Sequence, residues 1–223
     1  MNAARGIFVT GTDTGIGKTL VAAALLRAVV DGGRRAVGMK PVSAGIAAGA
    51  VVNADVDALL RAGNVDAPLA DRNPFALATA IAPHLAAREE GIAIDLEPID
   101  AAYQRLAALA DIVVVEGAGG ALVPINAQHD MLDVAARLQL PVLLVVGMRL
   151  GCLNHALLSA LAIHARGLQL AGWIANRIDP RMEAQEANVG YLMQRLPAPM
   201  IANIAWGATP TLSQAALGHL GLR

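Results

Sequence analysis

The feature that most constrains this chain is a glycine-rich turn at residues 11–19, Gly-Thr-Asp-Thr-Gly-Ile-Gly-Lys-Thr. Residues 7–10 before the turn have the apolar character of a buried strand, and residues 18–30 after it have that of a helix. In such a unit the backbone N–H groups and the helix N-terminus face an anion, and the lysine adds a positive charge. The hydroxyl that follows the lysine can ligate Mg²⁺. The turn therefore predicts a phosphate-binding loop.

The spacing of this loop departs by one residue from the general pattern G-x-x-x-x-G-K-[ST]. Thr12 stands where the first glycine belongs, and Gly11 lies one residue earlier, so the loop reads G-x₅-G-K-T. Glycine, threonine and aspartate are also ordinary turn formers, and Gly-Lys-Thr recurs by chance. The strand before the turn and the helix after it favour the phosphate loop over a plain turn.

Composition limits the classes of protein to which the chain can belong. Its 223 residues fit a single domain over residues 1–223, and 56% apolar against 16% charged residues argues against disorder. The net charge is −1 and no basic block suggests a nucleic-acid surface. The longest apolar runs are of strand length, so no membrane span is expected. The single cysteine, Cys152, suits a reducing compartment. The first expected strand starts too early to leave room for a signal peptide, so we expect a cytoplasmic protein.

Apolar runs alternate with helical patterns along the whole chain. Because several runs are apolar throughout, they suit strands buried on both faces, and the alternation predicts an α/β fold: a mostly parallel sheet with helices on both faces, as in P-loop NTPases. Ligands in such folds bind beyond the carboxyl ends of the strands. We interpret the polar segments 41–55 and 63–80 as loops near the site. The expected strands are 7–10, 36–39, 112–116, 142–147, 170–175 and 200–204, and the expected helices 18–30, 55–62, 98–109, 131–138, 154–165 and 182–195.

Two charged residues end expected strands. Lys40 follows the second strand, where it could stabilise charge on a transferring phosphoryl group or be a solvated surface lysine. Glu116 ends the buried run Val113-Val114-Val115 and precedes a glycine-rich turn. A carboxylate there is costly unless it is paired or binds metal, so a metal ligand is favoured over an exposed turn glutamate.

Three further polar residues have two interpretations each. Asp55 opens an expected helix and is more simply an N-cap than a metal ligand. Asn154 is a candidate cap for the helix that follows it, whose free N–H groups could receive a carboxylate. Asn176 ends the strand at 170–175, where its amide could bind a nucleotide base or merely form a turn.

Together these stretches resemble the dethiobiotin synthetases, which use ATP and CO₂ to close the ureido ring in biotin synthesis. The resemblance covers most of the chain, and the five-residue spacing in the phosphate loop is typical of that family. The motifs occur in the family's order: Phe-Val-Thr-Gly-Thr-Asp-Thr (8–14), Gly-Lys-Thr (17–19), Lys-Pro-Val (40–42), Ala-Pro-His (82–84), Val-Glu-Gly-Ala-Gly-Gly (115–120), Leu-Pro-Val (140–142), Leu-Gly-Cys-Leu-Asn-His (150–155), Ala-Gly-Trp-Ile-Ala-Asn (171–176) and Pro-Ala-Pro (197–199).

The resemblance implies a role for each matching residue. Lys40 and Lys18 would be catalytic, Mg²⁺ would be the cofactor, and ATP, CO₂ and 7,8-diaminononanoate the substrates of a cytoplasmic homodimer. The metal would be held by Thr19, Asp55 and Glu116. The nucleotide would contact Thr14, Gly15, Ile16, Gly17, Lys18, Thr19, Leu20, Glu116, Gly117, Ala118, Gly119 and Asn176. The diamine would contact Thr14, Ser43 and Gly119, and its carboxylate would reach Cys152, Leu153 and Asn154 of a neighbouring subunit.

Some positions depart from the family pattern. The family's substrate-binding serine follows the lysine by four residues, where this chain has Ala44, so Ser43 either replaces it through a shifted loop or the contact is lost. Gly15 stands where relatives often have an acid. Arg177 replaces a common aspartate and Ala205 a proline, and both bear on nucleotide selectivity.

Two alternatives of the same fold remain. One is an amidoligase, although those relatives usually add a glutaminase domain. The other is a switch-type ATPase that positions plasmids or division proteins. Such switches carry an additional lysine early in the loop, which is missing between Gly11 and Gly17.

Overall fold

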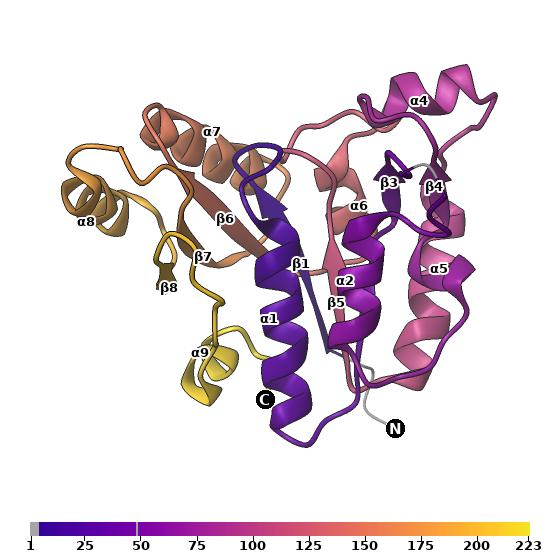
Figure 1. Cartoon of the computed structure of the whole chain (residues 1–223), viewed down its shortest axis with the longest axis horizontal. Helices are drawn as coiled ribbons and strands as arrows, with labels where there is room; N and C mark the ends of the chain where they lie inside the picture. The colour runs from indigo at the N-terminus through magenta and orange to yellow at the C-terminus, as the bar shows by residue number, and fades with distance from the viewer. Residues whose placement is uncertain (1–4, 48) are drawn as a thin grey trace.

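The computed structural model describes residues 5–47 and 49–223, which form a parallel sheet between two layers of helices (Figure 1). The six-stranded sheet has the order β2-β5-β1-β6-β7-β8, and every neighbouring pair is parallel. This confirms the predicted α/β fold and all six expected strands. They are β1 (Arg5–Gly11), β2 (Ala36–Met39), β5 (Ile112–Glu116), β6 (Val142–Met148), β7 (Leu170–Arg177) and β8 (Met200–Ile204).

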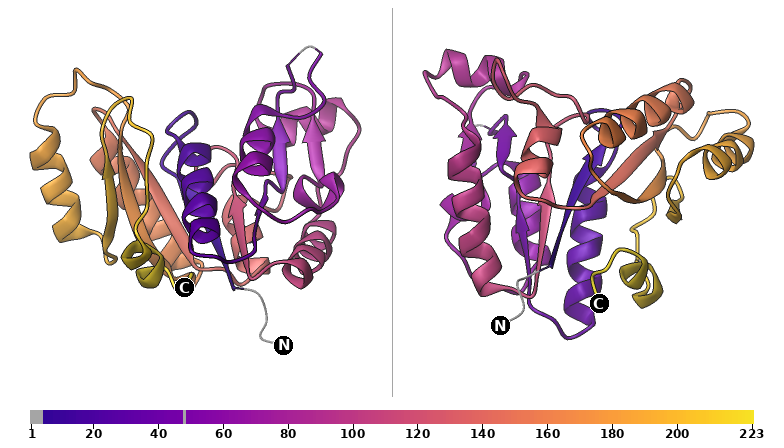
Figure 2. Two further views of the ribbon diagram at one scale, coloured as in Figure 1. Left: turned by 60° about the horizontal axis from the view of Figure 1, so that its bottom comes forward. Right: turned by 180° about the vertical axis from the view of Figure 1, so that it is seen from behind.

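The central strands are apolar throughout because both faces of the sheet are covered. In β1, Ile7 and Val9 pack on one face and Phe8 on the other, and all three are fully buried. One face is covered by α1 (Lys18–Asp31), α2 (Ala54–Ala62) and α9 (Gln214–His219). The other is covered by α5 (Leu96–Leu109), α6 (Met131–Arg137), α7 (Cys152–Ala165) and α8 (Gln185–Arg195) (Figure 2).

The expected loops at 41–55 and 63–80 contain more structure than the sequence indicated. β3 (Val42–Ala44) and β4 (Phe75–Leu77) pair as a second, two-stranded parallel sheet. The short helices α3 (Leu69–Arg72) and α4 (Pro83–Glu89) flank β4 in the chain. Strands of three residues are too short to show a periodic pattern, and each depends on a partner some 30 residues away.

Two capping predictions are wrong. The N-cap of α2 is Asn53, whose side chain accepts a hydrogen bond from the backbone N–H of Asp55, so Asp55 lies inside the first turn and its carboxylate is free for other contacts. Helix α7 begins at Cys152 after Gly151, which adopts a left-handed conformation with φ 95°. Asn154 therefore also lies within a first turn and does not cap the helix.

Candidate active site

The phosphate loop joins β1 to α1 at the carboxyl edge of the sheet, where the sequence placed it. Gly15 and Gly17 adopt left-handed conformations, with φ 71° and 90°. At Gly17 a Cβ atom would lie 2.3 Å from Nδ2 of Asn176, which donates a hydrogen bond to the carbonyl of Ile16 at 2.7 Å. Asn176 is thus a buried strand residue that supports the loop backbone, and the turn interpretation is wrong.

The Lys18 side chain folds back over its own loop. Its Nζ donates a hydrogen bond to the carbonyl of Asp13 at 2.8 Å, and the residue is only 6% exposed. Burial, followed by repulsion from Lys40, lowers the pKa of Lys18 to about 8. A negatively charged ligand in the loop would favour the charged form of this lysine.

Lys40 is buried between two carboxylates, so the interpretation as a solvated surface lysine is wrong. It is 3% exposed, and its Nζ donates to Oδ2 of Asp55 at 2.8 Å, to Oε1 of Glu116 at 2.6 Å and to the carbonyl of Gly117 at 3.2 Å. Burial opposes the charged form, but the carboxylates of Glu116 and Asp55 outweigh it and raise the pKa of Lys40. Burial likewise acts to raise the pKa of Asp55, yet Lys40 holds it below its usual value.

Thr19, Asp55 and Glu116 meet around this ammonium group although they lie far apart in the sequence. Glu116 is fully buried, which excludes the exposed turn glutamate, and its Oε1 also accepts a hydrogen bond from Oγ1 of Thr19 at 2.8 Å. Its Oε2 is buried without a hydrogen-bond partner among the described residues. An orphaned carboxylate oxygen beside a second carboxylate and a hydroxyl is a donor set that suits Mg²⁺.

No group of three or more His, Cys, Asp or Glu side chains that could hold a metal occurs within the described residues. Two carboxylates and a hydroxyl therefore have to be supplemented by other oxygen ligands. Mg²⁺ commonly takes these from water and from substrate phosphates. The residues present fit a metal that is bound together with a nucleotide.

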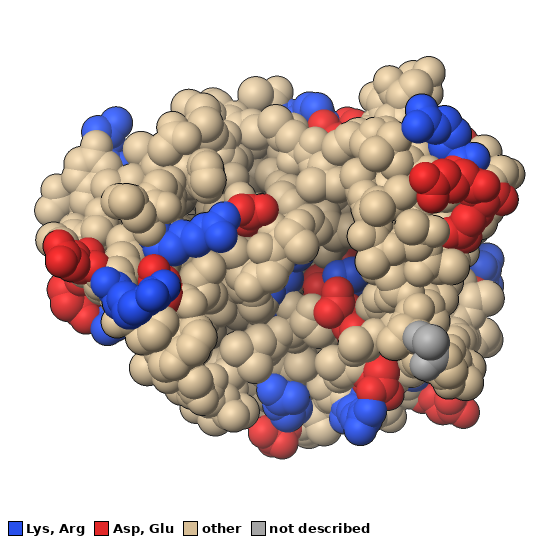
Figure 3. Space-filling view, turned by 45° about the horizontal axis from the view of Figure 1, so that its top comes forward, with Lys and Arg blue, Asp and Glu red and all other residues tan. Residues whose placement is uncertain are grey.

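A cavity of about 750 Å³ opens beside these groups at the carboxyl edge of the sheet. Figure 3 shows it as a hollow in the middle of the face, with positive and negative side chains at its base. Ile16 and Gly117 are outside this wall; Ile16 packs in the core instead. The lining includes Thr14, Gly15, Gly17, Lys18, Thr19, Leu20, Lys40, Ala44, Asp55, Glu116, Ala118 and Gly119.

The structure separates Ser43 from this cavity. Its hydroxyl is buried and donates to Oδ1 of Asn73 at 2.9 Å, whereas Ala44 lines the cavity wall. The loop has therefore not shifted by one residue, and contact between Ser43 and the substrate stays a prediction that this placement does not support.

Asn73 is a site residue that the sequence interpretation missed. Its Nδ2 donates to the carbonyl of Lys40 at 2.7 Å, and the backbone N–H of Lys40 donates to the carbonyl of Arg72 at the same distance. The backbone of Lys40 is thus fixed on both sides by a segment that was expected to be a loop. The only sequence signal was an Asn-Pro pair at residues 73–74, which is typical of turns.

The remaining predicted residues lie along the same edge but outside the cavity wall. Arg177 ends β7, where its guanidinium donates to Oδ1 of Asn203 at 3.1 Å and pairs with Glu186. Cys152, Leu153 and Asn154 form the first turn of α7, with Cys152 buried and Asn154 exposed. Within one chain, the α7 segment does not line the cavity that holds the two lysines.

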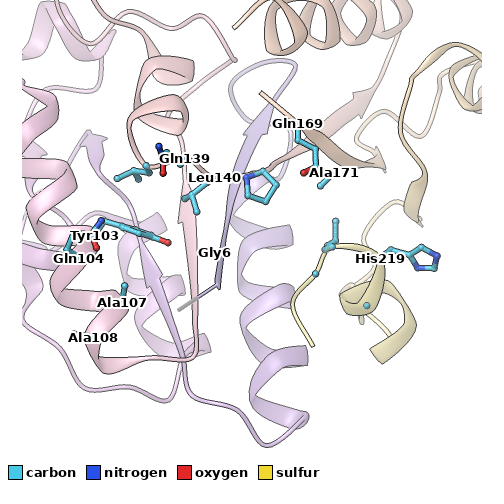
Figure 4. Close-up of a pocket in the computed structure, with 15 residues that line it drawn as sticks. Gly6, Tyr103, Gln104, Ala107, Ala108, Gln139, Leu140, Gln169, Ala171 and His219 are labelled. Carbon is cyan, nitrogen blue, oxygen red and sulfur yellow. The ribbon is translucent and has the colours of Figure 1, made fainter. Parts of the chain in front are cut away.

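A second cavity of about 780 Å³ lies at the opposite, amino edge of the sheet (Figure 4). Tyr103, Gln104, Gln139, Gln169 and His219 are the polar side chains among its described lining residues, which include no Lys, Arg, Asp or Glu. Ligands of parallel α/β sheets bind at the carboxyl edge. The charged cavity there is accordingly the candidate active site.

Comparisons with known proteins agree with this geometry. A family model described as an AAA domain matches residues 5–212. The ATP-dependent dethiobiotin synthetase BioD of Aromatoleum aromaticum is 51% identical over 221 residues, covering 97% of this chain and 98% of that protein. The enzyme of the same name from Nitrosospira multiformis is 53% identical over 201 residues, covering 90% and 88%.

Solved structures resemble the chain at the level of the fold. A ParA family ATPase from Chlorobium tepidum has a TM-score of 0.54 at 15% identity, covering 98% of this chain and 89% of that one. The MinD cell division protein of Aquifex aeolicus has a TM-score of 0.58 at 18% identity, with 99% and 86% coverage. These likenesses establish the P-loop NTPase fold alone. The identity of about half of all residues over nearly the full length is what places the chain: it belongs to the family of ATP-dependent dethiobiotin synthetases.

Proposed function

We propose that the chain is a dethiobiotin synthetase, which uses ATP and CO₂ to convert 7,8-diaminononanoate into dethiobiotin, ADP and phosphate. The observation that carries this proposal is that Lys18, Lys40 and two carboxylates line one cavity. The chain that holds them is about half identical to enzymes of that name. A switch-type ATPase would share the fold but is not favoured by these relatives.

The reaction has three steps. One amine of the substrate takes up CO₂ and loses a proton to give a carbamate. The γ-phosphoryl group of ATP passes to a carbamate oxygen, which yields a carbamic–phosphoric anhydride and ADP. The second amine attacks the anhydride carbon, closes the ring and expels phosphate. These steps depend on positioning and on stabilisation of charge more than on a protein nucleophile.

The two lysines have separate tasks in this scheme. Lys18 offsets charge on the β- and γ-phosphates held by the loop, and Lys40 stabilises the carbamate and the developing anhydride. Thr19, Asp55 and Glu116 would hold Mg²⁺, which would offset charge on the phosphate oxygens when bound with the nucleotide. We also assign binding of the adenine to Asn176, as the resemblance to the family implies, beside its support of the loop.

A homodimer completes the substrate site. The N-terminus of α7 carries the partial positive charge of a helix dipole, which favours an anion. On the outward stripe of α7, Asn154, Leu158 and Leu161 follow one another at helical spacing. Leu158 and Leu161 are 55% and 64% exposed, so the stripe presents apolar side chains that no other described residue covers. The stripe supports a two-fold contact in which each subunit receives the carboxylate of the other's substrate.

No described helix reaches the length and apolar character needed to span a lipid bilayer. The free, buried Cys152 suits a reducing compartment, which supports the cytoplasm as the site of action.

The proposal is tested by phosphate release from MgATP with bicarbonate, measured with and without the diamine. We expect release only when both are present, with a cyclic urea as co-product detected by mass spectrometry. Equal ATP turnover without the diamine would indicate a switch-type ATPase. Turnover that requires a different carboxylic acid and an amine donor would indicate an amidoligase.

A further inference from the structure

The Lys40 ammonium is held by the same side chains that the proposed function assigns to Mg²⁺. Its three hydrogen bonds, to Asp55, Glu116 and the carbonyl of Gly117, use all three of its donors. Two of these acceptors are the carboxylates to which the proposed function assigns Mg²⁺. The ammonium is therefore the internal counter-ion of the metal-binding carboxylates.

The ammonium and a metal ion would share the same two carboxylate groups. Oε1 of Glu116 already accepts from both Lys40 and Thr19, whereas Oε2 has no partner among the described residues. A divalent cation bound to Glu116 and Asp55 would lie beside the Lys40 ammonium in a buried site. Repulsion between the two is strong there because buried charges are poorly screened.

The charge of the site decides when a metal can enter. Lys18 and Lys40 balance Asp55 and Glu116, so a free divalent cation would add two uncompensated positive charges. A metal that arrives on a nucleotide brings the negative charge of the polyphosphate with it. The phosphate oxygens also give the displaced ammonium new acceptors in the same cavity.

Only the side chain of Lys40 is free to move away from the carboxylates, because its backbone is fixed. Its N–H donates to Arg72 and its carbonyl accepts from Asn73, so the main chain is held on both sides. The flexible four-carbon stem can turn into the cavity that the residue lines.

We propose that Lys40 keeps the metal site closed to free divalent cations and releases Glu116 and Asp55 only when the metal arrives with the nucleotide. Lys40 thereby determines specificity for the metal–nucleotide complex. This inference rests on the metal site of the proposed function.

The test uses Mn²⁺ as the probe and measures its binding to the nucleotide-free protein by electron paramagnetic resonance. Wild-type protein should bind Mn²⁺ weakly. Lys40→Met should bind Mn²⁺ at least about 10-fold more tightly, a usual size for the coupling between two cations that interact with the same groups. Lys18→Met is the matched control, because it removes the same charge from the same cavity but no hydrogen bond to a carboxylate. It should tighten Mn²⁺ binding clearly less than Lys40→Met does, because both carboxylates keep their hydrogen bonds to Lys40.

Equal Mn²⁺ affinities of wild type and Lys40→Met would overturn the proposal, as would equal tightening in both variants. Should Lys40→Met fail to fold, the wild type decides the matter. Mn²⁺ that binds as tightly without ADP as with it would show that the site is open. Mn²⁺ that does not bind even with ADP would refute the metal site itself, while the phosphate-release assay tests the reaction independently.

Discussion

Lys40 owes its character to residues that are distant in the sequence. The strand pattern placed it at the carboxyl edge of the sheet, but its burial depends on Asp55 from α2 and on Glu116 from β5. Nothing near Lys40 in the chain distinguishes such a lysine from a solvated one. Removal of one partner from a buried charge pair is strongly destabilising, so the three side chains form a unit.

Replacement of Lys40 should affect turnover more than nucleotide binding. We expect Lys40→Met to lower kcat by about 100- to 1000-fold, the usual effect of losing one donor that meets charge in the transition state. The KM for MgATP should change less than kcat does, because the main proposed task of Lys40 is to stabilise the carbamate and the developing anhydride. Lys18→Met should impair both parameters, since Lys18 faces the phosphates. Steady-state kinetics measure both, and near-normal kcat in Lys40→Met would exclude a catalytic role.

Asn73 should act as a positioning residue for Lys40. Asn73→Ala leaves the buried carbonyl of Lys40 without its side-chain donor, which costs about 1–3 kcal/mol of stability. We expect kcat to fall while the KM for MgATP stays near its wild-type value, since the phosphate loop is untouched. Ser43→Ala is the matched control: it removes a hydroxyl that contacts Asn73 but not the cavity. A raised KM for the diamine in Ser43→Ala would contradict our placement of that side chain.

Among the structural elements, long buried strands could be predicted from the sequence and short paired ones could not. β5 and β6 are buried at every residue, and such runs of apolar side chains are visible in the chain. β3 and β4 have three residues each and exist because they pair with one another beside α4. Arg72 and Asn73, which fix the backbone of Lys40, lie at the end of α3, just before β4 of this second sheet, which is why Asn73 escaped prediction.

The phosphate loop depends on close approach between two elements. A Cβ atom at Gly17 would meet the Asn176 amide at 2.3 Å, while one at Gly15 would have no described atom within 4 Å. Both glycines have positive φ, so both alanine variants carry backbone strain. Only Gly17→Ala also displaces Asn176. We expect it to weaken nucleotide binding, measured by calorimetry, at least about 10-fold more than Gly15→Ala, a difference of about 1.4 kcal/mol. Equal effects would show that strain alone matters.

The amino ends of β2 and β5 are joined by an ion pair between Arg35 and Asp111. The carboxylate of Asp111 accepts from the backbone N–H and the guanidinium of Arg35, at 2.9 and 3.1 Å, and these bonds lower the pKa of Asp111. A carboxyl whose pKa is lower in the folded state stabilises the fold above its unfolded pKa of about 3.9, and this contribution is lost as the pH falls through the folded pKa.

Thermal unfolding should therefore separate wild type from Asp111→Asn at neutral pH. The difference in Tm should shrink as the pH falls below about 4, where the wild-type carboxyl takes up its proton. A difference in Tm that does not change with pH would mean that the charge of Asp111 contributes nothing.

At the scale of the whole molecule, the outward stripe of α7 is an apolar surface without a partner among the described residues. Asn154, Leu158 and Leu161 lie on it, opposite the buried residues Cys152 and Ala156. The cavity with the two lysines lies at the same carboxyl edge of the sheet, but α7 does not line it within one chain. A substrate with amines at one end and a carboxylate at the other can use both only if a second subunit brings its own α7.

The dimer should therefore dissociate when this stripe acquires charge. We expect Leu161→Glu to sediment as a monomer and to have a raised KM for the diamine, because the carboxylate loses its anchor. Leu109→Glu is the matched control, since Leu109 is 41% exposed at the end of α5, away from the α7 stripe. It should sediment and turn over like the wild type.

Asn154→Ala tests binding of the substrate carboxylate separately from formation of the dimer. This variant should remain a dimer and raise the KM for the diamine more than it lowers kcat, because the carboxylate end of the substrate does not react. Diamine analogues that lack the carboxylate should bind wild type and Asn154→Ala alike, since neither can use the anchor. A Leu161→Glu monomer with wild-type kinetics would show that one subunit suffices. A Leu161→Glu monomer could instead keep its kcat at saturating diamine and need a far higher diamine concentration to reach it. That result would show that the monomer has lost binding of the substrate carboxylate, as the exposed stripe of α7 implies.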